Sequence, residues 1–74
     1  MSKITFEIVE HLADLSENAS GWMKEVNLVS WNGRAAKYDI REWDPEHQSM
    51  SKGITLTEDE MRQLIESVQS YLNK

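Results

Sequence analysis

Aromatic and basic side chains are concentrated in residues 31–53, which read WNGRAAKYDIREWDPEHQSMSKG. The stretch holds Trp31 and Trp43, two of the three tryptophans, together with four of the eight basic residues. Flat aromatic rings can stack on exposed bases, while Lys and Arg neutralise phosphates. These residue types therefore favour binding to single-stranded nucleic acid.

A β-hairpin and its return strand must position these side chains. Asn32-Gly33 predicts the hairpin because both residues readily adopt the positive φ angles of a tight turn. In the return strand, residues 37–43, side chains alternate between the two faces of the sheet. The odd positions put two cations, a carboxylate and an indole on one face: Lys37, Asp39, Arg41 and Trp43. The other face has the apolar pair Tyr38 and Ile40, so we expect the cationic face to be the outer, ligand-binding surface.

Three further strands are expected around this hairpin. Apolar alternation predicts a first strand over residues 4–15, with a bulge or bend near residues 9 and 10 where the alternation breaks. The turn-rich segment 16–21 leads to a second strand at 22–31. Both faces of that strand are mixed, so the pattern leaves open which one is buried, and a bulge between Val26 and Val29 would exchange them. A short fourth strand is predicted at 54–56.

The most regular pattern lies near the end of the chain. Thr57 and Glu60 form a capping box, in which the Thr hydroxyl accepts from the Glu60 amide while the Glu60 side chain reaches back. The helix is predicted from Thr57 to about Tyr71, which gives an α+β order of four strands and one helix. Its apolar side chains follow helical spacing along one stripe: Met61, Leu64, Ile65, Val68 and Leu72.

Size and composition limit the class of protein. A chain of 74 residues is expected to form one domain, 1–74, which is marginally stable alone. It has no cysteine, which excludes disulfides and thiolate metal sites, so we expect support from a second copy. The first residues lack the apolar segment of a signal peptide, and no apolar run approaches a membrane span. We therefore expect a cytoplasmic or nucleoid-associated protein that does not bind a membrane.

The net charge of −5 by itself argues against nucleic-acid binding. The acidic excess lies near the two ends, because residues 1–21 hold one lysine against four carboxylates and residues 54–74 hold two basic residues against four carboxylates. Residues 22–53 are balanced, with five basic and five acidic residues. Phosphate binding depends on the local potential, so we expect a cationic groove on an acidic body, with salt-sensitive binding.

Several segments occur in an order and spacing that resemble a known family. These segments are YDIREW at 38–43, DPE at 44–46, and KGITLT at 52–57 before the C-terminal helix. They resemble the positive cofactor 4 family, transcriptional coactivators with a single-stranded-DNA-binding domain. Upstream segments are similar to the small bacterial YdbC-type members and extend the resemblance over nearly all of the chain: FEI at 6–8, LSENA at 15–19, GW at 21–22 and VSWN at 29–32.

The resemblance implies a four-stranded antiparallel curved sheet followed by one C-terminal helix, in a homodimer that presents a groove. It implies non-enzymatic binding of single-stranded DNA with low sequence preference, in transcription, replication or repair, while single-stranded RNA stays open. Aromatic stacking residues are expected at the hairpin and at the end of the third strand. The candidate nucleic-acid-binding residues are Lys24, Trp31, Arg34, Lys37, Arg41, Trp43 and Lys52, and the apolar stripe of the helix is the candidate dimer interface.

The chain departs from the family pattern close to these residues. It is one residue longer between Gly33 and Asp39, which leaves the matching of Arg34 and Lys37 open, and it is shorter after Trp43. The 74 residues do not include the Ser- and Lys-rich extension of eukaryotic members, so we do not expect contacts with transcriptional activators.

Two other classes of function stay open. A protein-interaction module would use the aromatic hairpin as an anchor, and its binding need not weaken with salt. A hydrolase or nuclease has only isolated carboxylates in its favour. No metal site and no cofactor are expected, because His11 and His47 are far apart in sequence and no pair with metal-ligand spacing occurs.

Overall fold

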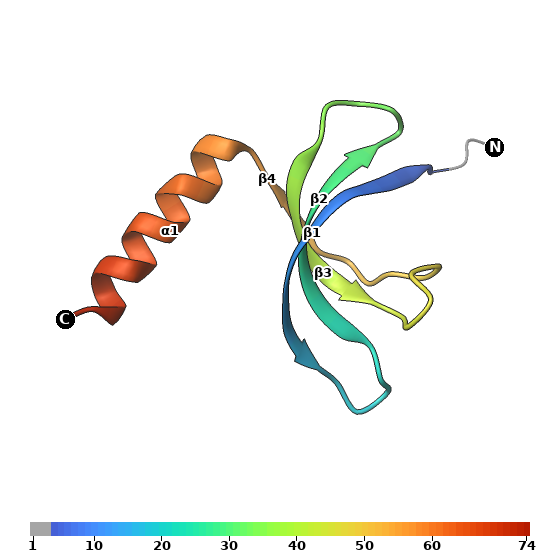
Figure 1. Ribbon diagram of the computed structural model, residues 1–74, viewed down its shortest axis with the longest axis horizontal. Helices are drawn as coiled ribbons and strands as arrows, with labels where there is room; N and C mark the ends of the chain where they lie inside the picture. The colour runs from blue at the N-terminus through green and yellow to red at the C-terminus, as the bar shows by residue number, and fades with distance from the viewer. Residues whose placement is uncertain (1–3) are drawn as a thin grey trace.

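The computed structural model describes residues 4–74 and shows a curved antiparallel sheet followed by one helix (Figure 1). The strands are β1 (Phe6–Glu17), β2 (Met23–Trp31), β3 (Lys37–Trp43) and β4 (Ile54–Leu56), and the helix is α1 (Glu58–Leu72). The strand order in the sheet is β1-β2-β3-β4. The predicted fold class is confirmed, and β3 and β4 have the predicted bounds.

Three bulges interrupt the pairing of β1 with β2. The register shifts between Ile8 and Glu10, between His11 and Ala13, and between Asp14 and Ser16. The bulge predicted near residues 9 and 10 is therefore confirmed, and two more follow it. A bulge bends its strand and increases the local twist, so three of them curl this edge of the sheet (Figure 1).

Strand β2 keeps the same two faces along its whole length. Its pairing with β3 runs without a shift from Met23 opposite Trp43 to Val29 opposite Lys37. The change of face that a bulge between Val26 and Val29 would cause therefore does not occur. The buried face of β2 is the one that carries Glu25, Asn27 and Val29.

The face of β3 that carries Arg41 and Trp43 is the inner face of the curve. It was expected to be the outer surface, but Asp39 and Trp43 have no solvent exposure. Two parts of the chain cover this face. One is the curled strand β1, and the other is the segment between β3 and β4, which lies on the concave side of the sheet (Figure 1). Trp43 packs there against Phe6 and His47, with ring centroids 5.0 and 5.5 Å apart.

Helix α1 begins at the predicted capping box. The Thr57 hydroxyl accepts from the Glu60 amide at 3.2 Å, and the Glu60 carboxylate accepts from the Thr57 amide at 2.8 Å. The helix extends away from the convex side of the sheet (Figure 1), and of its residues only Met61 is buried. Within residues 4–74, no helix is long and apolar enough to cross a membrane.

Candidate nucleic-acid interface

A groove of about 680 Å³ opens on the concave face, between the start of β1, the end of β2 and the segment before β4. Ligand sites in proteins commonly have volumes of about 300–1,000 Å³, so the groove has room for a nucleotide base. Three of the predicted nucleic-acid-binding residues meet in it: Trp31, Arg41 and Lys52. Phe6, Gln48 and Ser51 also line the groove, although the sequence did not indicate them as site residues.

Trp31 is the larger of the two aromatic residues that line this groove. Its ring is half-buried and lies against Phe6, with centroids 5.8 Å apart and planes tilted by 49°. The guanidinium carbon of Arg41 lies 4.7 Å from the centroid of the Trp31 ring, within the range of a cation–π contact. The Trp31 indole N–H is buried and has no hydrogen-bond partner among the described residues. The ring is therefore fixed by packing and by Arg41 rather than by its own polar atom.

Arg41 is itself fixed by the buried carboxylate of Asp39. The Arg41 Nε donates to Asp39 Oδ1 at 2.7 Å and Nη2 donates to Oδ2 at 2.8 Å, a bidentate pair. The third guanidinium nitrogen donates to the Ser51 carbonyl oxygen at 3.4 Å. Only 14% of the Arg41 side chain is exposed. Most of its charge is thus engaged within the protein, and its geometry is set before any ligand arrives.

The predicted cations other than Arg41 differ in how close they lie to this groove. Lys52 is exposed and lines both this groove and a neighbouring one that Lys24 also lines. Gly53 allows the chain to pass beside β3 at this point, because a methyl group there would overlap the Ile40 carbonyl oxygen and the Arg41 Cβ. Arg34 and Lys37 are exposed at the hairpin between β2 and β3 and line neither groove.

Trp43 occupies a different environment from Trp31. Its side chain is fully buried, and its indole N–H also has no partner among the described residues. Its ring contacts Phe6, which in turn contacts Trp31. The structure therefore places Trp43 beneath the groove, where it supports the residues that line it.

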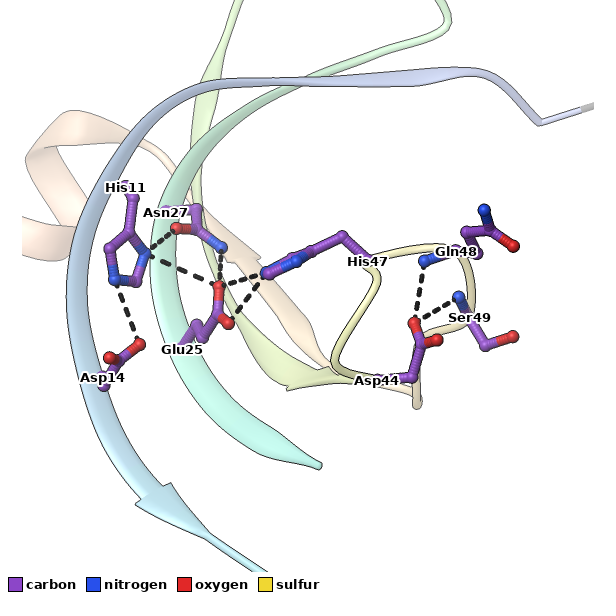
Figure 2. A network of polar contacts seen from close by, with 8 residues as sticks. All are labelled: His11, Asp14, Glu25, Asn27, Asp44, His47, Gln48 and Ser49. Carbon is purple, nitrogen blue, oxygen red and sulfur yellow. Dashed lines mark hydrogen bonds and ion pairs between the residues drawn. The ribbon is translucent and has the colours of Figure 1, made fainter. Parts of the chain in front are cut away.

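Asp44 organises the loop that crosses the concave face after β3. Its Oδ1 accepts from the amides of Gln48 at 2.7 Å and Ser49 at 2.8 Å (Figure 2). These backbone donors, with Ser49 the largest contributor, lower the pKa of the Asp44 carboxyl below its usual value. His47 in the same loop has a positive φ of 58°, which turns the chain back towards the sheet.

A polar network lies at the other end of the concave face (Figure 2). The buried Glu25 accepts from Asn27 Nδ2 at 3.1 Å and lies 2.9 Å from His47 Nε2. His11 Nδ1 lies 2.6 Å from Asn27 Oδ1, and His11 Nε2 lies 3.0 Å from an oxygen of Asp14. The hydrogen bond to Asn27 and the nearby carboxylates raise the pKa of His11. The network joins β1, β2 and the loop after β3.

Comparison with known proteins adds two findings to this geometry. The family described as "Transcriptional Coactivator p15 (PC4)" matches residues 18–67. An uncharacterized protein from Treponema pallidum (strain Nichols) is 42% identical over 66 residues, which cover 85% of this chain and 78% of that protein. The family match spans β2 to β4 and most of α1, and it begins after β1.

The buried pair of Asp39 and Arg41 gives a prediction about stability. Arg41→Ala leaves the Asp39 carboxylate buried without its partner, so we expect the free energy of unfolding to fall by about 3–5 kcal/mol. The double variant Asp39→Asn/Arg41→Ala removes the buried charge as well and should regain much of this loss. Urea unfolding followed by circular dichroism measures both. If Arg41→Ala is as stable as the unmodified chain, or if the double variant regains nothing, the pair does not hold the face together.

Proposed function

Because the chain belongs to the family of Transcriptional Coactivator p15 (PC4), a non-enzymatic DNA-binding family, we propose that it binds single-stranded DNA and catalyses no reaction. The proposed setting is transcription, replication or repair, in the cytoplasm or at the nucleoid. The observation that carries the proposal is the groove in which the Trp31 ring, the Arg41 guanidinium and the Lys52 ammonium lie together.

Base stacking on Trp31 supplies the main attraction in this proposal. A base stacked on an aromatic side chain contributes about 1–3 kcal/mol, and every base offers a flat face. Sequence preference is therefore low. Arg41 and Phe6 hold the ring in place, so little conformational freedom of Trp31 is lost when the base binds.

Exposed cations around the groove neutralise the phosphates of the strand. Lys52 lies at the groove. Lys24 lies on the opposite face of the sheet from the groove, since its neighbour Glu25 faces inwards, and it lines a second groove that Lys52 also lines. Arg34 and Lys37 are exposed at the hairpin. Because the whole chain has a net charge of −5, this local attraction is weak at long range and is readily screened. A duplex hides its bases from the groove, so the single strand is preferred.

The exposed apolar side of α1 supports a homodimer. Four of the five predicted interface residues are exposed: Leu64 by 41%, Ile65 by 53%, Val68 by 45% and Leu72 by 71%. A helix of 15 residues with so little packing is marginal in water. Pairing with a second copy across a two-fold axis would bury this stripe on both chains at once. The dimer then presents two grooves to one strand.

Binding to a labelled oligo(dT) of about 20 nucleotides, followed by fluorescence anisotropy at several salt concentrations, tests the function. We expect salt-sensitive binding to the single strand and much weaker binding to the matching duplex. Trp31→Ala should weaken the binding about 5- to 150-fold through the lost stacking, while Trp31→Phe keeps a flat ring and should lose less. Lys52→Ala should reduce the slope of log affinity against log salt by about 0.7.

Lys74→Ala is the matched control for Lys52→Ala, because Lys74 lies at the far end of α1 against Tyr71. It removes the same charge and should leave binding unchanged. Absence of binding to the single strand at low salt would contradict the proposed function. Binding that does not depend on salt or on Trp31 would instead contradict the proposed site.

Sedimentation tests the homodimer. The chain has a mass of 8.6 kDa, and we expect a species of roughly twice that mass at micromolar concentration. Ile65→Glu should give a monomer, because it places a charge in the middle of the apolar stripe. Gln63→Glu adds the same charge to the opposite side of the helix and should remain a dimer. A monomeric unmodified chain, or a dimeric Ile65→Glu variant, would refute this interface.

A further inference from the structure

The bulges of β1 bring a second group of side chains to one point of the concave face. In a regular strand, His11 and Asp14 would point to opposite faces, because they are three residues apart. The bulge between His11 and Ala13 removes this offset, so that His11 lies opposite Asn27 and Asp14 lies opposite Glu25. The loop after β3 adds His47 to the same Glu25 (Figure 2).

The distances within this group suit a shared ion. One ligand atom each from His11, Asp14 and Glu25 can be chosen so that all three lie within 4.8 Å of one another. Tetrahedral zinc, with bonds of about 2.0–2.2 Å, needs ligand atoms roughly 3.3 Å apart. The Asp14 side chain is 55% exposed, so it has room to move and close this gap. Glu25 is the fixed point, since only 6% of its side chain is exposed.

Hydrogen bonding already sets His11 in a metal-binding tautomer. The Asn27 amide donates from Nδ2 to Glu25, so its oxygen faces His11 Nδ1 at 2.6 Å and requires a proton there. Nε2, which lies 3.0 Å from an Asp14 carboxylate oxygen, is then the ring nitrogen at which a metal ion would replace the second proton. Metal-binding histidines commonly donate their other ring N–H to an oxygen in this way. Asn27 is the buried group that fixes the ring.

The surrounding cleft, of about 630 Å³, favours a cation. Glu17 and Asp44 line it together with Asp14 and Glu25, and of the described residues that line it none is Lys or Arg. The concave face is thus divided into a cationic half around Trp31 and an anionic half around Glu25. Two neutral imidazoles and two carboxylates would balance the charge of one divalent ion.

We propose that His11, Asp14 and Glu25, joined by His47 as the fourth ligand, bind a divalent transition-metal ion of the zinc type. His47 Nε2 lies within 3.1 Å of both Glu25 oxygens and its side chain is 40% exposed, so it lies beside the carboxylate that would bind the ion and is not held by burial. Nitrogen and carboxylate oxygen are ligands that zinc accepts. His11 and His47 are far apart in the sequence, which argued against a metal site. The fold brings both of them to Glu25.

The ion has a structural role in this proposal. It joins β1, β2 and the loop after β3, and that loop carries Gln48, which lines the groove beside Trp31. Binding the ion would therefore restrain one wall of the groove and neutralise the charges of Asp14 and Glu25 in the other half of the concave face. The metal site does not depend on nucleic-acid binding, so the two proposals fail separately.

Calorimetric titration of the full, untagged chain with Zn²⁺ tests the site, at about pH 8, because binding of a metal ion to histidine displaces a proton and strengthens as the pH rises. We expect one ion per chain and a rise in the unfolding temperature. Co²⁺ should bind in the same place and give the visible absorption of a four-coordinate ion. Asp14→Asn and His11→Asn should each weaken Zn²⁺ binding by about tenfold or more. His47→Gln can still donate to Glu25 and should change the Co²⁺ spectrum.

Glu10→Gln is the matched control, because it removes one carboxylate from β1 outside the cluster and should bind Zn²⁺ as the unmodified chain does. Circular dichroism verifies that each variant is folded. Failure to bind Zn²⁺ and Co²⁺, or equal binding by Asp14→Asn, His11→Asn and Glu10→Gln, would overturn the site. An unchanged Co²⁺ spectrum in His47→Gln would overturn the assignment of the fourth ligand.

Discussion

Three extra residues in β1 bend one edge of the sheet over its own inner face, and the other features follow from this curl. A regular ladder that starts with Glu17 opposite Met23 would place Phe6 opposite Arg34, whereas the bulges place it opposite Trp31. Phe6 then contacts both Trp31 and Trp43. The same shifts turn His11 and Asp14 to one side. Without the bulges, the aromatic groove and the polar cluster would both be lost.

Burial of charge on the concave face constrains what each cation can do. Asp39 is fully buried and takes up two donors of Arg41, so that Arg41 orients Trp31 and contributes little free charge. The exposed Lys52 is in the opposite situation, since its charge is available to a ligand. Two cations that look alike in the sequence therefore differ in role, because one has a buried partner on its own strand.

Much of the fold could be predicted from local signals. The Asn32-Gly33 turn, the alternation of residues 37–43 and the capping box at Thr57 each depend on neighbouring residues only, and the structure has all three. The direction in which the sheet curves depends on contacts between distant segments. For that reason the face of Trp43 was expected to be outer and is inner.

The residues of the candidate site divide in the same way. Some are indicated by signals in the neighbouring sequence, and others are brought in only by contacts between distant segments. Trp31, Arg41 and Lys52 come from the predicted stretch, while Phe6 enters through the bulges and Gln48 through the loop that Asp44 folds. The pairing of His11 with His47 across Glu25 has no local signal at all. The groove is tested by following the indole N–H resonances of Trp22, Trp31 and Trp43 in NMR spectra while oligo(dT) is added. Base stacking in the groove should give a large shift for Trp31 and smaller ones for the other two. An unmoved Trp31 resonance, with shifts confined to residues outside the groove, would contradict it.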